Sequence, residues 1–178
     1  MDSVTAARNG DESAFLRLFD QHHPPLYRFA YKMTGSAADA EDVVQECFLG
    51  LLRPSCSYDP ERTPIRTYLF GVVRNQSQKR LERNARTGEH SSEPADARTP
   101  ESLALQTELK SVVACAVMEL PESQRDVLIL AHYEQMSLSE IAALLELETT
   151  AVKSRLQRGR ARLKELLAAY APELEKRS

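Results

Sequence analysis

The segment that most constrains the fold covers residues 137–164, SLSEIAALLELETTAVKSRLQRGRARLK. Ser137 and Glu140 have the S-x-x-E spacing of a capping box, in which two side chains satisfy backbone N–H groups at a helix start. Apolar residues then recur on one helical face: Ile141, Leu144 and Leu145. The pattern predicts a short capped helix that ends near Glu146.

A second helix is expected after this turn, capped by Thr149 or Thr150. Its apolar residues fall largely on one side: Val152, Leu156, Leu163, Leu166 and Leu167. Its remaining surface is basic, through Lys153, Arg155, Arg158, Arg160, Arg162 and Lys164, and residues 149–164 contain no acid. A short helix, a tight turn and a basic helix form a device for placing one helix in the DNA major groove. The simpler alternative is a solvated basic helix that only packs through its leucines.

Composition favours an all-α protein. The chain has 178 residues, a net charge of -3 and only 6 glycines, and helix formers dominate. Its three cysteines, Cys47, Cys56 and Cys115, lack C-x-x-C spacing and are interpreted as reduced thiols. No stretch approaches the roughly 20 apolar residues of a membrane span. We therefore expect a soluble, cytoplasmic protein.

A change of composition predicts two domains. The segment RTGEHSSEPADARTPES has no large apolar residue, so it cannot bury enough surface to offset its ordering entropy. We expect a first domain at 1–86, a flexible linker at 87–101 and a second domain at 102–178. The predicted fold is two small helical bundles on a tether, with a helix-turn-helix in the second.

Four helices are expected in the first domain. The first covers about 12–22; Pro24 and Pro25 then break it and open a second helix that ends at Gly35. The third starts after Ser36 and ends near Arg53, with an apolar stripe on one side and an acidic face on the other. The fourth covers about 65–84 and ends in basic residues.

The second domain also reads as four helices. An amphipathic helix is expected at about 103–118, and a second helix after Pro121 contains the apolar run VLIL. The helix-turn-helix completes the bundle.

These segments together resemble the extracytoplasmic-function (ECF) sigma factors, the two-domain initiation subunits of bacterial RNA polymerase. The resemblance lies in LYRFAYKMTGSAADAEDVVQECFLGLL, SYDPERTPIRTYLFGVVRNQSQKRLER and ELPESQRDVLILAHYEQMSLSEIAALLELETTAVKSRLQRGRARLKELL. It implies a promoter-recognition subunit without enzymatic activity, whose partners are core RNA polymerase, promoter DNA and an anti-sigma factor.

The resemblance also implies site residues. The DAEDVVQE helix is expected to bind core polymerase through Asp39, Glu41, Asp42, Gln45 and Glu46. Such a face suits a partner rich in Arg and Lys; without the resemblance it would be read as merely solvated.

Two DNA sites are implied as well. An unstacked base of the minus-10 element would be captured around Tyr58, Asp59, Arg62, Tyr68, Arg74 and Asn75, with Lys79 and Arg80 following. The minus-35 element would be read by Thr150, Lys153, Ser154, Gln157, Arg158 and Arg160. Arg155 could instead pack or pair within its domain.

This chain departs from the family pattern at several positions. Glu146 and Glu148 stand where Gly and Ser are common, which implies a strained or differently shaped turn. Ala151 replaces a frequent Thr, Lys79 stands where an acid is common, and Trp is absent.

Three other classes of protein share some of these features. A sigma-like decoy that sequesters an anti-sigma partner has no need of a basic recognition helix. An ordinary helix-turn-helix regulator has no need of the DAEDVVQE helix. The sequence does not support an enzyme, because it has no Gly-rich phosphate loop and because His22 and His23 lack metal-ligand spacing. We expect no metal and no cofactor.

Overall fold

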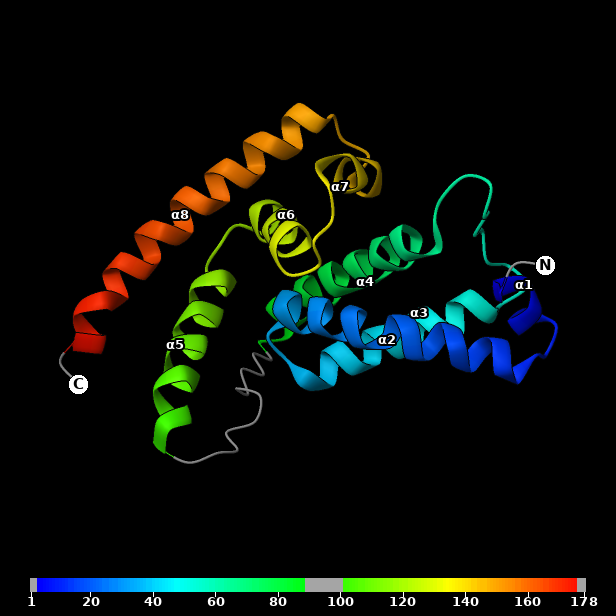
Figure 1. Cartoon of the computed structure of the whole chain (residues 1–178), viewed down its shortest axis with the longest axis horizontal. Coiled ribbons are helices and arrows are strands. Elements are labelled where there is room, and N and C mark those ends of the chain that lie inside the picture. Colours follow the sequence, from blue (N-terminus) through cyan, green and yellow to red (C-terminus); the bar gives the residue numbers. More distant parts are fainter. Residues whose placement is uncertain (1–2, 89–100, 176–178) are drawn as a thin grey trace.

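The computed structural model describes residues 3–88 and 101–175, and these contain helices and no strand (Figure 1). The helices are α1 (Ser3–Arg8), α2 (Glu12–Thr34), α3 (Ala37–Leu52), α4 (Ile65–Thr87), α5 (Glu101–Met118), α6 (Glu122–His132), α7 (Leu138–Leu145) and α8 (Thr149–Glu175). The all-α expectation is confirmed.

The first bundle is built by α2, α3 and α4, with α1 across one end (Figure 1). Phe29 of α2 meets Phe70 of α4 edge to face at 5.4 Å between ring centroids. Ser36 caps α3, because its hydroxyl accepts a hydrogen bond from the Asp39 N–H at 3.2 Å. The expected third and fourth helices are therefore present, whereas α1 was not predicted.

The predicted break at Pro24 and Pro25 is wrong, because α2 continues through both prolines. Two backbone hydrogen bonds are lost there, which normally ends a helix. The buried face continues on both sides of the prolines, with Leu18 and His22 before them and Leu26 after them. Burial of this face against α3 and α4 outweighs the local penalty.

The second bundle contains α5 to α8, as expected. Both halves of the capping box form at α7: Ser137 Oγ accepts from the Glu140 N–H at 3.2 Å, and the Ser137 N–H donates to Glu140 Oε2 at 2.7 Å. The cap of α8 differs from the expectation. The Val152 N–H donates to the Glu148 carbonyl at 3.1 Å, so Glu148 holds the N-cap position instead of Thr149 or Thr150.

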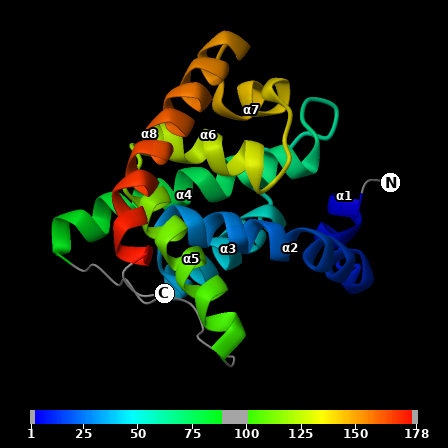
Figure 2. The ribbon, with the colours of Figure 1, turned by 60° about the vertical axis from the view of Figure 1, so that its left-hand side comes forward.

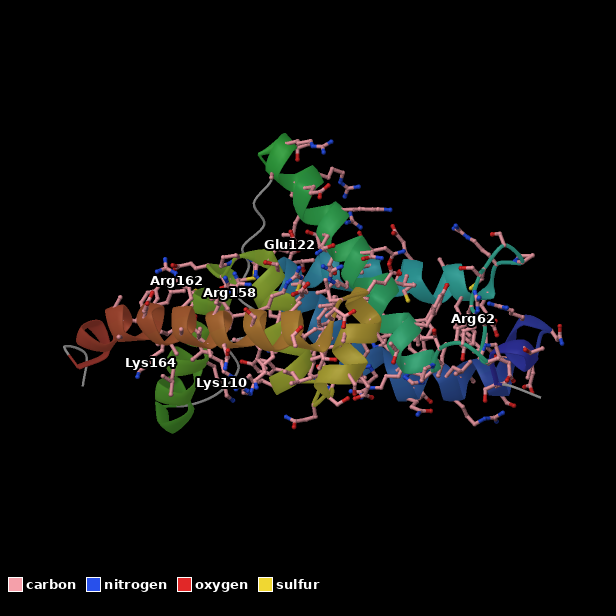
Figure 3. All side chains as sticks on the ribbon, turned by 90° about the horizontal axis from the view of Figure 1, so that it is seen from above. Arg62, Lys110, Glu122, Arg158, Arg162 and Lys164 are labelled. Carbon is pink, nitrogen blue, oxygen red and sulfur yellow. The ribbon has the colours of Figure 1, made fainter. Side chains whose placement is uncertain are left out.

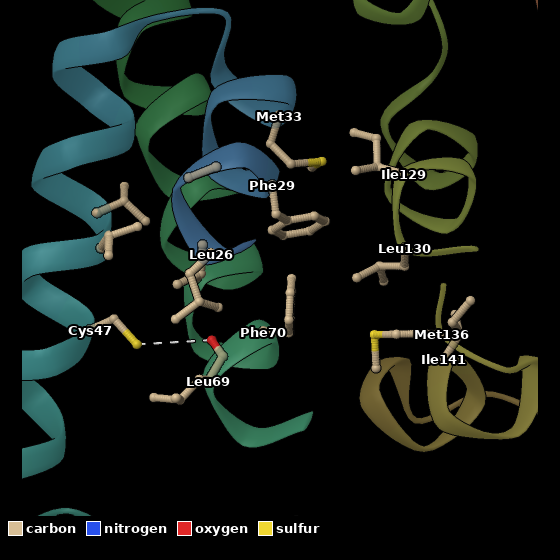
Figure 4. Close-up of a cluster of buried hydrophobic side chains, with 14 of the residues drawn as sticks. Leu26, Phe29, Met33, Cys47, Leu69, Phe70, Ile129, Leu130, Met136 and Ile141 are labelled. Carbon is tan, nitrogen blue, oxygen red and sulfur yellow. Dashed lines mark hydrogen bonds between the residues drawn. The ribbon is translucent and has the colours of Figure 1, made fainter. Parts of the chain in front are cut away.

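The two bundles lie against each other, with α6 and α7 beside α2 and α4 (Figure 2). Apolar side chains from both sides face each other, including Phe29, Met33 and Phe70 from the first bundle and Leu130 and Met136 from the second (Figure 4). This docking was not predicted. Most of the proposed linker at 87–101 lies outside the described residues.

Candidate nucleic-acid and protein interfaces

The predicted recognition helix presents its nominated polar residues to solvent. Thr150, Lys153, Ser154, Gln157, Arg158 and Arg160 are all exposed on α8. The opposite side is held by buried Val152 and Leu156, which pack into the second bundle. Figure 3 shows Arg158, Arg162 and Lys164 along α8, far from Arg62 at the other end of the molecule. A one-sided basic helix of this kind can enter a groove without disturbing its own core.

The turn before α8 has the left-handed conformation that the family pattern provides with glycine. Glu146 has φ 53° and ψ 45°, and its N–H donates to the Ala142 carbonyl. Leu147 N–H donates to the same carbonyl at 2.9 Å. The turn is therefore formed by a non-glycine residue in a left-handed conformation, and that residue carries the strain of the conformation.

The nominated acidic face of α3 surrounds one arginine of α4. Arg80 lies 3.5 Å from Asp39, 3.1 Å from Asp42 and 3.9 Å from Glu46, with 14% of its side chain exposed. Asp42 and Glu46 remain more than half exposed, and so retain oxygen atoms for a partner. A residue nominated for DNA thus pairs with residues nominated for core polymerase, a link that sequence spacing does not reveal.

The remaining two nominated residues of α3 interact with each other. The Gln45 amide donates to Glu41 Oε1 at 2.9 Å, and His23 Nε2 of α2 lies 3.6 Å from Glu41 Oε2. All five residues nominated for core polymerase lie on α3.

An aromatic pair forms at the start of α4. The rings of Tyr58, from the preceding loop, and Tyr68 lie 5.1 Å apart, and both residues are half-buried. Cys56 Sγ is 3.3 Å from Tyr68 Oη. Burial raises the pKa of Tyr68 to about 12, so its hydroxyl is a neutral hydrogen-bonding group. Aromatic walls with a polar edge are suited to holding an unstacked base.

The other residues nominated for the minus-10 site separate into two groups. Asp59, Arg62, Asn75 and Lys79 are exposed, and Arg62 lies 3.9 Å from Asp59. Arg74 faces the second bundle, where its Nε donates to Asp126 Oδ2 at 2.8 Å. Arg74 Nη1 also donates to Asn75 Oδ1 at 3.3 Å, so these two nominated residues are in contact.

A shallow groove joins α3 and α4. It is lined by Val43, Glu46, Gln76, Lys79, Arg80 and Arg83. Glu46 makes the α3 border of this groove acidic, and Lys79, Arg80 and Arg83 make its α4 border basic.

The polar residues between the bundles were not predicted from the sequence. Arg125 is buried and donates to the carbonyl oxygens of Met33 at 3.0 Å and of Leu120 at 3.0 Å. Burial lowers the pKa of Arg125, and burial raises that of Glu134, which lies at the same interface. One sequence signal could have indicated them. Arg125 and Asp126 directly precede the apolar run VLIL, and charged residues next to a buried run are rarely buried unless they are paired.

Two further findings concern the described residues only. No group of three or more His, Cys, Asp or Glu side chains in them is placed to hold a metal ion. None of their helices combines the length and apolar character required to cross a bilayer.

Comparison with known proteins agrees with this geometry. The Sigma-70 region 2 family model matches residues 18–87, and the Sigma-70 region 4 model matches residues 111–163. The chain is 28% identical to the ECF RNA polymerase sigma factor SigW of Bacillus subtilis, covering 92% of this chain and 94% of that protein. It is 32% identical to the ECF sigma factor SigL of Mycobacterium tuberculosis, covering 88% of this chain and 90% of that protein.

Two solved structures have the same fold. One is CnrH in complex with the cytosolic domain of CnrY, with TM-score 0.71, 29% identity and coverage of 94% of this chain and 96% of that chain. The other is the sigma factor RpoE in complex with the anti-sigma factor NepR from Bartonella quintana, with TM-score 0.68, 26% identity and coverage of 86% and 96%.

The fold and the exposed basic helix define a two-domain, DNA-binding subunit of the transcription machinery. The chain belongs to the ECF RNA polymerase sigma factors, and its function is promoter-specific transcription initiation.

Proposed function

We propose that the two bundles divide promoter recognition between them. The first bundle, residues 1–86, binds core polymerase and captures the minus-10 element, and the second, residues 102–178, reads the minus-35 element. The observation that carries this proposal is α8, where six nominated polar residues are exposed on a helix preceded by a capped α7.

The acidic face of α3 is the proposed site for core polymerase. Asp42 and Glu46 remain accessible despite their pairing with Arg80, and Glu41 and Gln45 extend the same helix. Complementary charge on a basic partner would fix the docking register and speed association.

The pair of Tyr58 and Tyr68 is the proposed site for a flipped minus-10 base. Stacking on aromatic rings is worth about 1–3 kcal/mol per base, which is comparable with the few kcal/mol needed to unstack one. Strand separation would then follow from trapping, so the protein needs no catalytic step of its own and is not an enzyme.

An anti-sigma factor is a proposed partner. Support comes from the similar structures of CnrH with CnrY and of RpoE with the anti-sigma factor NepR. The protein would act in the cytoplasm, where core polymerase and the chromosome are found.

Run-off transcription tests the proposal. Purified chain and core polymerase are incubated with a library of genomic fragments, and the transcript starts are mapped. We expect starts that share two upstream elements and require the chain. A chain that neither binds core nor directs initiation on any fragment would contradict it.

A further inference from the structure

The last residue of α6 lies beside the basic helix α8. The two helices pack closely (Figure 1), because Gly159 of α8 has no side chain and an added Cβ there would lie 3.3 Å from the Gln124 carbonyl oxygen. Gly159 is buried, and the next residue, Arg160, is exposed at the edge of the packed face. There Arg160 Nε donates a hydrogen bond to His132 Nε2 at 3.1 Å. The sequence pattern did not indicate a role for His132.

Arg160 belongs to a row of nominated residues on one edge of α8. Lys153, Gln157 and Arg160 are spaced i, i+4 and i+7, so their side chains leave the same face of the helix. All three are exposed. His132 contacts the C-terminal member of this row. A residue of α6 therefore holds one of the side chains proposed to read the minus-35 element.

The hydrogen bond defines the state of both side chains. Nε2 of His132 accepts, so the imidazole is neutral and carries its proton on Nδ1. With its Nε engaged, the Arg160 guanidinium keeps the N–H groups of Nη1 and Nη2, and this end of the fork can still donate two parallel bonds to a guanine edge or a phosphate. The backbone of His132 is held as well, because Gln135 Nε2 donates to its carbonyl oxygen.

We propose that His132 is a positioning residue for promoter recognition, which orients the Arg160 guanidinium for a two-bond contact with the minus-35 element and acts on DNA only through that arginine. A free arginine side chain loses rotamer freedom when it binds, and orienting it beforehand lowers that cost. This inference rests on the proposed minus-35 role of α8.

The test removes the hydrogen-bond acceptor and the arginine separately and together. His132→Leu removes the acceptor at an exposed position, whereas His132→Gln keeps an oxygen that can accept from Arg160 Nε. Arg160→Gln and the double variant His132→Leu with Arg160→Gln complete a double-mutant cycle. Ser123→Leu, exposed at the opposite end of α6, is the matched control.

The measurement is the affinity of the holoenzyme for promoter duplexes whose upstream element is defined by mapped transcript starts. We expect His132→Leu to weaken binding about fivefold, the factor for immobilising one rotamer-rich side chain. His132→Gln and Ser123→Leu should stay within about twofold of the parent. In the Arg160→Gln background, His132→Leu should change affinity by less than about twofold, because the group that His132 positions is gone.

The double-mutant cycle separates positioning from the alternatives, because a purely structural role or a direct DNA contact of His132 would persist in the Arg160→Gln background. A persistent loss, an unchanged His132→Leu variant, or a His132→Gln variant as weak as His132→Leu would overturn the inference. An Arg160→Gln variant that binds like the parent would overturn it as well.

Upstream footprints of the parent holoenzyme are recorded in parallel. A parent that protects the upstream element keeps the proposed minus-35 role of α8 even when the cycle contradicts the role of His132. A parent without upstream protection loses both the proposed role of α8 and the inference that rests on it.

Discussion

At the scale of single residues, the turn between α7 and α8 carries identifiable strain. Glu146 has a left-handed backbone, which costs a non-glycine residue about 1–2 kcal/mol. Glu146 stands where the family pattern has glycine, and it adopts the left-handed conformation that favours glycine, so the turn is strained.

Replacing Glu146 by glycine should therefore stabilise the protein. We expect Glu146→Gly to raise the free energy of unfolding by about 1 kcal/mol, because relief of strain exceeds the added entropy of the unfolded chain. Chemical denaturation measures the change. Glu165→Gly, on the exposed helical backbone of α8, is the matched control and should destabilise by about 1 kcal/mol. Equal signs for the two variants would contradict the account.

His22 should make stability depend on pH. Its side chain is buried, and burial, followed by the nearby Arg66, lowers its pKa from 6.5. Because the folded state disfavours the protonated form, stability is fully present above pH 6.5 and falls as pH decreases through the lowered pKa. Glu134 acts in the opposite direction, since burial raises its pKa above 4.5.

The contribution of His22 to the pH dependence of stability can be isolated by comparing the parent with His22→Gln. We expect the stability of His22→Gln to lose the part of the pH dependence that begins below about pH 6.5. The control is His132→Gln, at an exposed position where Arg160 Nε lies 3.1 Å from His132 Nε2. Thermal melting from pH 7.5 to 5 gives both curves, and parallel curves for parent and His22→Gln would show that His22 does not titrate in this range.

At the scale of helices, sequence reasoning succeeded where the cause was local. The capping box at Ser137 and the cap at Ser36 involve residues three apart, so the sequence contains both partners. It failed at Pro24 and Pro25, where the cause is tertiary. The helical spacing of Leu18, His22 and Leu26 across the prolines was the available signal.

The exposed face of α8 predicts how DNA binding responds to salt. Replacing Lys153 or Arg158 by alanine should weaken binding to the upstream promoter element and reduce the log–log salt slope by about one unit per lost phosphate contact. Footprinting of the holoenzyme at several salt concentrations measures both effects. Arg162→Ala, at a position paired with Glu165 at 3.1 Å, is the control; identical slopes for all variants would count against the assignment.

The acidic face of α3 predicts how affinity for core polymerase responds to charge changes. Reversing Asp42 and Glu46 to Lys should lower affinity for core polymerase, because their exposed oxygen atoms are the proposed contacts. Arg80→Gln is the informative control. It disrupts the same internal pairs but leaves the carboxylates free, so core affinity should be kept or increased. A core-binding titration in which both variants lose affinity equally would indicate that the face only stabilises the fold.

At the scale of the whole molecule, the docking of the bundles could not be predicted from the sequence. Arg74 and Asp126 are 52 positions apart, and Arg125 and Met33 are 92 apart. No local sequence pattern links residues so far apart. The linker segment has no large apolar residue, and this led us to expect two bundles that do not pack against each other. The site residues on α3 and α8 were nominated from the family resemblance, and the structure shows that each set lies on one helix.

The division of labour between the bundles is the central claim, and site-specific photocrosslinking in the open promoter complex tests it most directly. Tyr58 and Gln157 are replaced one at a time by a photoreactive phenylalanine analogue, and crosslinked nucleotides are mapped on a promoter whose start is known. We predict that position 58 crosslinks to the non-template strand in the minus-10 element and position 157 to duplex DNA in the minus-35 element. Crosslinks from both positions to one element, or none from position 157, would contradict the account.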